Sequence, residues 1–107
     1  MSKIQIKKNR MPLEKRIADI FDSRKDQLVG YQVWLFGSRG RGSPRPNSDY
    51  DIGILGEKPI DLATYFEIQD AMEALPTLHT IDWVDLNRAT KSLRENVQKE
   101  GKLLYEG

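Results

Sequence analysis

Two aspartates separated by one residue, Asp49 and Asp51, begin a segment that is otherwise apolar, DYDIGIL. Side chains alternate between the two faces of a β-strand, so both carboxylates project to one side, about 6.6–7 Å apart along the chain. Two like charges this close repel each other unless a cation lies between them. Hard oxygen donors on a rigid element are the ligands that Mg²⁺ requires. The segment therefore predicts a magnesium-binding strand whose opposite face belongs to the core.

A second apolar segment, TIDWVDL at residues 80–86, also carries carboxylates. If Ile81 and Trp83 face the core, Asp82 lies on the open face of the sheet. A third carboxylate beside the first pair would complete a ligand set for two ions about 3.5–4 Å apart, which is the arrangement that promotes in-line phosphoryl displacement. The alternatives are that Asp82 is an ordinary solvated strand residue and that Asp85 begins a turn or a helix.

A loop rich in glycine and arginine, beginning FGSRGRG, precedes the paired aspartates. Gly37 allows a ligand to approach the backbone closely. Ser38 and the N–H groups after it can donate to phosphate oxygens, and Arg39 and Arg41 add permanently charged planar donors. The spacing matches neither G-x-G-x-x-G nor a P-loop. The loop favours phosphate binding, with a simple mobile connection as the alternative.

The elements that must position these residues follow from periodicity and from helix and strand signals. Residues 1–11 are expected to form a flexible basic leader, and residues 12–107 a single folded domain. We expect helices from Pro12 towards a stop at Gly30, over about 62–75 with Asp61 as cap, and over 90–100, and strands over 31–36, 49–55 and 80–86, with KLLY returning to the sheet edge. The predicted fold is α/β (α+β): helices packed on a small mixed sheet.

Composition excludes several other classes of site. The chain of 107 residues has no cysteine and one histidine, His79, so disulfides, thiolate metal sites and multi-histidine metal sites are excluded. A net charge of +1 gives no general case for nucleic acid as a partner. The absence of a secretory signal and of a long apolar run leads us to expect a cytoplasmic protein without a membrane span. His79 is expected to be an ordinary loop or strand-edge residue.

Taken together, these residues resemble the motif of the nucleotidyltransferase superfamily that includes DNA polymerase β. That motif is Gly-Ser, a spacer, Asp-x-Asp and a third acidic residue on a later strand. Here Gly37-Ser38 are followed by ten residues and then Asp49-Tyr50-Asp51. The short chain resembles in particular the minimal nucleotidyltransferase (MNT) group, along residues 31–107. The resemblance implies the polymerase β-like fold and transfer of a nucleoside monophosphate, commonly AMP from ATP, to an acceptor hydroxyl with release of pyrophosphate.

The resemblance also implies roles for individual residues. Asp49 and Asp51 would bind two Mg²⁺ ions, for which Mn²⁺ can substitute. Asp82 would bind the catalytic ion and help to deprotonate the attacking hydroxyl, so the three aspartates are both the catalytic and the metal-binding residues. The nucleotide-binding residues that the resemblance implies are Gly37, Ser38, Arg39 and Arg41.

Partners follow from the same resemblance. Larger relatives carry a further helical domain that shapes the acceptor pocket, and we expect this chain to borrow that half from a partner. In the MNT group the partner is often a helical HEPN protein, and the pair acts as a toxin–antitoxin system in which the MNT protein adenylylates the toxin. Two alternatives remain: transfer to a small aminoglycoside-like molecule, with a homo-oligomer supplying the pocket, and a non-catalytic antitoxin module that only binds its partner.

Overall fold

The computed structural model describes residues 12–37 and 49–107. The expected leader at 1–11 lies outside the described residues. The elements, in chain order, are α2 (Leu13–Asp22), the 3-10 turn η1 (Lys25–Gln27), β1 (Gln32–Phe36), β2 (Tyr50–Leu55), α4 (Leu62–Glu73), β3 (Ile81–Asp85), the 3-10 turn η2 (Leu86–Arg88), α5 (Lys91–Glu100) and β4 (Lys102–Glu106).

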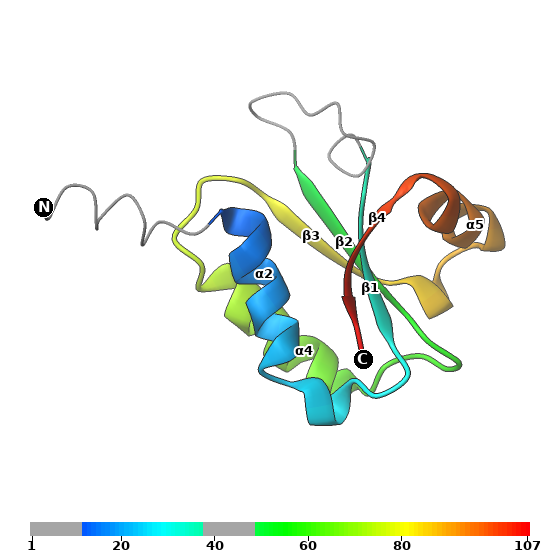
Figure 1. Cartoon of the computed structure of the whole chain (residues 1–107), viewed down its shortest axis with the longest axis horizontal. Helices are drawn as coiled ribbons and strands as arrows, with labels where there is room; N and C mark the ends of the chain where they lie inside the picture. Colours follow the sequence, from blue (N-terminus) through cyan, green and yellow to red (C-terminus); the bar gives the residue numbers. More distant parts are fainter. Residues whose placement is uncertain (1–11, 38–48) are drawn as a thin grey trace, which may run out of the picture.

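The described strands form one mixed sheet in the order β3-β2-β1-β4. β1 runs antiparallel to both β2 and β4, whereas β2 and β3 are parallel and are connected through α4. Helices α2 and α4 lie together against one face of the sheet, and α5 contacts β1 and η2 (Figure 1). The predicted fold of helices on a small mixed sheet is confirmed.

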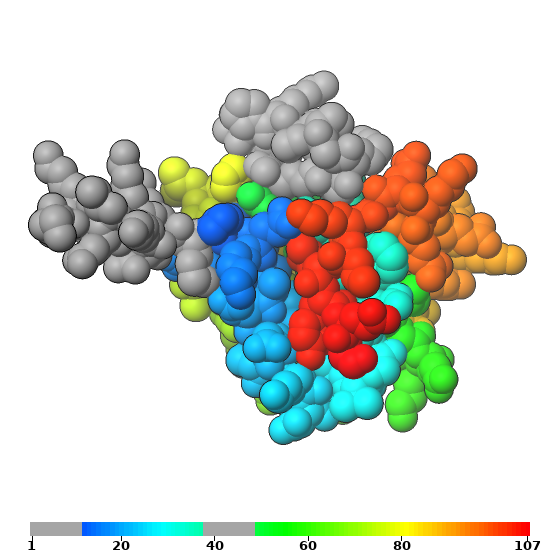
Figure 2. Space-filling model, in the orientation of Figure 1, coloured from blue at the N-terminus to red at the C-terminus, as the bar shows by residue number. Residues whose placement is uncertain are grey.

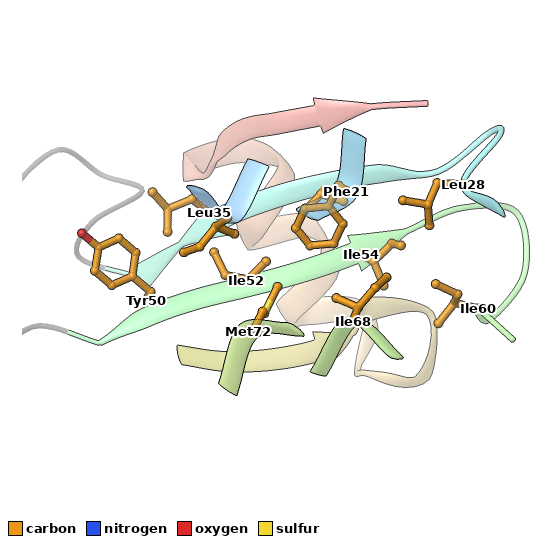
Figure 3. Close-up of a cluster of buried hydrophobic side chains, with 11 residues drawn as sticks. Phe21, Leu28, Leu35, Tyr50, Ile52, Ile54, Ile60, Ile68 and Met72 are labelled. Carbon is orange, nitrogen blue, oxygen red and sulfur yellow. The ribbon is translucent and has the colours of Figure 1, made fainter. Parts of the chain in front are cut away.

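The core lies between the sheet and the pair α2–α4. Alternate residues of β2 point into it, because Tyr50, Ile52 and Ile54 are all buried, as the strand pattern predicts (Figure 3). Helix α2 supplies Ile17 and Phe21, which are fully buried. The remaining buried members of this cluster are Leu28, Val33, Leu35, Ile60, Ile68 and Met72. Burial of this apolar surface is the main favourable contribution to folding.

The edge strand β3 is attached to α4 by two reciprocal hydrogen bonds. The Tyr65 hydroxyl donates to the Trp83 carbonyl at 2.8 Å, and the Trp83 indole N–H donates to the Tyr65 carbonyl at 3.1 Å. The two rings stack with centroids 5.4 Å apart, and Trp83 also contacts the ring of Phe21 at the same centroid distance. Trp83 therefore faces the core as expected, which directs its neighbour Asp82 away from it.

The other edge of the sheet is formed by β4, so the expected return of the C-terminal segment to the sheet is confirmed. β4 lies beside α2 on one surface of the molecule (Figure 2). The Lys102 ammonium pairs with the Glu14 carboxylate of α2 across this contact. No helix in the described part of the chain is long and apolar enough to cross a membrane.

The first helix ends earlier than its apolar spacing predicts, at Asp22 instead of near Gly30. The hydroxyl of Ser23 donates to the carbonyl of Ile20 at 2.7 Å, and such side-chain bonds to the backbone favour helix ends. The chain then forms η1 and a turn at Gly30, where φ is +84°. Leu28 is fully buried all the same. The apolar spacing therefore reflects burial of Leu28 by a separate turn.

Asp61 caps α4, as predicted, by accepting a hydrogen bond from the backbone N–H of Thr64 at 3.2 Å. We expect Asp61→Ala to lower the free energy of unfolding by about 1 kcal/mol, because this donor loses its partner. Asp61→Ser, which keeps a capping oxygen, should lose only a small part of that stability. Urea unfolding of the three proteins measures the difference, and an equal loss in both variants would contradict the capping role.

Candidate active site

The end of β1 and the beginnings of β2 and β3 meet at one end of the sheet, where the predicted acidic residues lie. Asp51 is in register with Phe36 of β1 on one side and with Asp82 of β3 on the other. The backbone N–H of Tyr50 donates to the carbonyl of Thr80 at 2.9 Å, which joins the beginnings of β2 and β3. Residues in register on adjacent strands point to the same face. Asp51 and Asp82 therefore lie side by side on the face opposite the core.

The negative charges of Asp49 and Asp82 affect the pKa of Asp51. Asp51 is half-buried, whereas Asp49 and Asp82 are exposed. Burial raises the pKa of the Asp51 carboxyl, and the charge of Asp82, a hydrogen bond shared with Asp82 and the charge of Asp49 raise it further. Like charges are therefore close enough to disfavour the ionised form of Asp51. The tertiary structure thus places Asp82 beside Asp51 and keeps Asp49 near enough to influence the charge of Asp51.

Gly37, the residue after β1, contacts this acidic cluster. Its φ is +72°, a conformation that residues with a side chain rarely adopt. A Cβ atom here would overlap the Oδ2 atom of Asp51 and would lie 3.4 Å from its Cγ atom. The backbone that begins the predicted phosphate loop therefore lies directly against the Asp51 carboxylate. The other predicted loop residues, Ser38, Arg39 and Arg41, lie outside the described residues.

The donor set fits a divalent cation bound by oxygen ligands. Among residues 12–37 and 49–107, no group of three or more histidine, cysteine, aspartate or glutamate side chains already converges as a metal site. Asp51 and Asp82 nevertheless present adjacent carboxylates, and Asp49 is within electrostatic range of Asp51. A cation between them would relieve the repulsion that raises the pKa of Asp51. Hard carboxylate oxygens are the ligands of Mg²⁺ and Mn²⁺.

Asp85, the other acidic residue of β3, has a structural role. It is buried on the core face and accepts a hydrogen bond from the backbone N–H of Asn87 at 3.0 Å, which caps η2. Its second carboxylate oxygen lies 3.4 Å from the Arg88 guanidinium. Asp85 pairs in register with Ile54, three residues along β2 from Asp51. The interpretation of Asp85 as a residue that begins a turn is confirmed.

A groove of about 440 Å³ beside Asp82 was not predicted from the sequence. Its walls include Gln69, Met72 and Glu73 of α4 and His79 of the loop that leads into β3. His79 packs edge-on against the ring of Tyr50 with centroids 5.3 Å apart, consistent with the expected loop role. The α4 residues are separated in sequence from the acidic motif and have no catalytic pattern of their own. Only the return of the chain through α4 brings them to the site.

We expect Asp51→Asn to stabilise the metal-free protein at neutral pH. The pKa of Asp51 is raised in the folded state, so folding is favoured by this group at low pH and loses that contribution as pH rises through the raised pKa. The uncharged variant avoids this loss. In a chelating buffer its unfolding temperature should exceed the wild-type value by a few degrees at pH 7. The difference should shrink towards pH 4, and an equal difference at both pH values would contradict this electrostatic origin.

Comparison with known proteins assigns the chain to a family. The sequence profile of the family described as "Polymerase beta, Nucleotidyltransferase" matches residues 15–107, which is most of the chain. The chain belongs to the polymerase beta nucleotidyltransferase family. The predicted resemblance is thus confirmed, and the matched range includes every described strand of the sheet and the residues Asp49, Asp51 and Asp82.

Individual members of the polymerase beta nucleotidyltransferase family are similar over much of the chain. The probable protein adenylyltransferase MntA of Haemophilus influenzae is 32% identical over 68% of this chain and 65% of its own length. This chain thus spans slightly less than two thirds of that relative. A crystal structure of a toxin–antitoxin with AMP-PNP matches at 30% identity and a TM-score of 0.64, covering 88% of this chain and 73% of the other.

A further solved structure is that of a tri-AMPylated Shewanella oneidensis HEPN toxin in complex with its MNT antitoxin. The match has 27% identity and a TM-score of 0.60, and it covers 89% of this chain and 71% of the other. These solved structures support the same nucleotidyltransferase architecture for the described residues.

Proposed function

We propose that this chain is a divalent-metal-dependent adenylyltransferase that transfers AMP from ATP to a hydroxyl group of a HEPN-type protein, as the antitoxin of a cytoplasmic toxin–antitoxin pair. The observation that carries the proposal is the register of Asp51 with Asp82 on adjacent parallel strands, with Asp49 close enough to affect the pKa of Asp51. Carboxylates in this arrangement, with Gly37 lying against that of Asp51, suit the binding of a metal–triphosphate complex.

The relatives support the substrate and the partner. One is named a probable protein adenylyltransferase, and one matched toxin–antitoxin structure contains AMP-PNP, an analogue of ATP. Another contains an AMPylated HEPN toxin together with an MNT antitoxin. We extend both the nucleotide and the class of acceptor to this chain because its acidic residues occupy one face at the end of the sheet, where a shared substrate can reach them.

The proposed metal site consists of Asp49, Asp51 and Asp82, with Mg²⁺ as the expected ion and Mn²⁺ as a substitute. Bound divalent ions would supply neutralisation of the negative charge on the triphosphate and on the leaving pyrophosphate. The backbone at Gly37, followed by Ser38, Arg39 and Arg41, is proposed to hold the phosphates.

Asp82 is proposed to orient the acceptor hydroxyl and to accept its proton. The acceptor oxygen forms a bond to the α-phosphorus of ATP while the bond from that phosphorus to the pyrophosphate oxygen breaks. Asp82 suits this role because it is exposed at the edge strand, whereas Asp51 is half-buried between its neighbours. A general base must be within hydrogen-bonding reach of the proton it removes, and an acceptor can approach Asp82 from the open edge of the described sheet.

The test combines nucleotide binding with transfer. AMP-PNP is titrated into the purified chain with and without Mg²⁺ by calorimetry. Radiolabelled ATP is then supplied together with the S. oneidensis HEPN toxin or a HEPN-type protein from the source organism of this chain. Mass spectrometry should find an added AMP group on the HEPN protein. Transfer to an aminoglycoside alone would favour the small-molecule alternative, and a stable HEPN complex without nucleotide binding or transfer would favour the non-catalytic module.

A further inference from the structure

The strand order places the parts of the proposed reaction in a row. Gly37 follows β1, Asp51 lies on β2, Asp82 lies on β3, and β3 is the edge strand of the described sheet. The groove of about 440 Å³ lies beyond them, between this edge strand and α4. Moving outward across the sheet from β1, the order is therefore Gly37, Asp51, Asp82 and the groove.

In-line displacement requires the attacking and leaving oxygens to lie on opposite sides of the reacting phosphorus. The proposed triphosphate site places the pyrophosphate near Gly37, so the attacking hydroxyl must approach from the side of Asp82. The groove is lined by Ile81 and Trp83 from the core face of β3 and by Asp82 from the opposite face, so it reaches around the edge of the sheet to the side of Asp82. Its position therefore matches the side from which an acceptor must enter.

The charge of the groove suits an acceptor and disfavours the nucleotide. Helix α4 carries three acidic residues and no basic residue, and the acidic residue that lines the groove is Glu73. Because Asp82 is assigned to the metal site, the negative charge of the groove comes from Glu73, which disfavours a triphosphate there and attracts a positively charged segment. Buried Met72 and half-buried Trp83 add an apolar surface, and Gln69 adds hydrogen-bonding capacity. This mixture suits a polypeptide segment.

Hydrogen bonds within and between its walls fix the shape of the groove. The reciprocal hydrogen bonds between Tyr65 and Trp83 connect its two walls, α4 and β3. On its far side, the His79 backbone N–H donates to the Thr77 hydroxyl at 3.0 Å, which orders the loop before β3. A binding surface formed by rigid elements requires little reorganisation when a ligand binds.

We propose that this groove binds the segment of the acceptor protein that carries the reacting hydroxyl, and that the segment has basic residues. Glu73 and Gln69 determine its specificity, and the groove directs the hydroxyl towards Asp82. This inference rests on the proposed adenylyltransferase function and deepens it, because it assigns the acceptor subsite to residues of this chain.

The test compares three variants of α4 in the transfer assay with a HEPN protein. Glu73→Lys reverses the charge in the groove, and Gln69→Trp fills part of its volume. Asp70→Lys is the matched control, because Asp70 is exposed on the same helix, undergoes the same charge change and does not line the groove. We expect the KM for the HEPN protein to rise about tenfold in both groove variants, with little change in the control. The affinity for AMP-PNP should be unchanged in all three, and circular dichroism verifies their folding.

Each outcome separates the two proposals. Groove variants that are folded and keep the wild-type KM for the HEPN protein would overturn the acceptor subsite while leaving the adenylyltransferase function intact. Weakened AMP-PNP binding in Glu73→Lys and Gln69→Trp, with the KM for the HEPN protein unchanged, would assign the groove to the nucleotide instead. Absence of transfer by the wild-type chain to either HEPN protein would contradict the proposed function itself, and the acceptor subsite with it.

Discussion

Asp51→Asn is expected to lower the rate of AMP transfer on the order of 10³-fold and to remove Mg²⁺-dependent binding of AMP-PNP. The substitution keeps the shape of the side chain but removes the charge of the carboxylate that interacts with both Asp82 and Asp49. Asp49 precedes β2 and Asp82 lies on β3, so the proposed metal site loses the carboxylate that interacts with both of the others. Release of pyrophosphate measures the rate, and calorimetry measures AMP-PNP binding.

Asp85→Asn provides the matched control for this prediction. Asp85 is also an aspartate on the sheet, but its carboxylate caps η2 and pairs with Arg88 away from the cluster. We expect this variant to be less stable than the wild type and to keep most of its transfer rate. Transfer by Asp51→Asn at more than about a tenth of the wild-type rate would contradict the metal-binding role and support a function that does not need catalysis.

Gly37→Ala is expected to reduce transfer at least about 100-fold, because the added methyl group must displace the Asp51 carboxylate that it would overlap. The residue must also keep a φ of +72°, which adds a cost of about 1 kcal/mol in folding stability. Steady-state kinetics of AMP transfer and urea unfolding measure the two effects separately.

Gly30→Ala separates the effect of the contact with the Asp51 carboxylate from the stability cost of a positive φ. Gly30 has a similar φ of +84°, but a Cβ atom there would meet nothing within 4 Å. We expect the same loss of stability, about 1 kcal/mol, with the transfer rate retained. If both glycine variants lost activity equally, the loss in Gly37→Ala would have to come from general destabilisation and not from the Asp51 carboxylate.

The sequence by itself determined which residues share a face. Alternation along β2 predicted that Asp49 and Asp51 lie opposite Tyr50, Ile52 and Ile54, and the three apolar residues are indeed buried. This prediction is possible because the direction of a strand side chain depends only on its position in the strand. The spacing of Gly37-Ser38 and Asp49-Tyr50-Asp51 also identified the family correctly, because the motif lies within one continuous stretch of chain.

Local sequence patterns predicted the end of the first helix less well, because burial alone produced the apolar spacing after Asp22. The buried Leu28 extended the apparent helix towards Gly30, although the helix ends at Asp22 and a separate turn buries that leucine. Apolar periodicity records which side chains reach the core, and a turn after a helix can satisfy the same pattern. The roles of Ser38, Arg39 and Arg41 remain predictions from the sequence.

Only the tertiary structure decided which residues of different strands and helices are neighbours. The register that joins Asp51 to Asp82 connects strands separated by the whole of α4, and the sequence pattern of either strand is compatible with other registers. Packing of Trp83 against Phe21 and its hydrogen bonds to Tyr65 select this one, because a shift by one residue would turn Trp83 out of the core and Asp82 into it. The groove between α4 and β3 arises from the same packing. Its position beside Asp82 is therefore a property of the fold, not of any segment of the sequence.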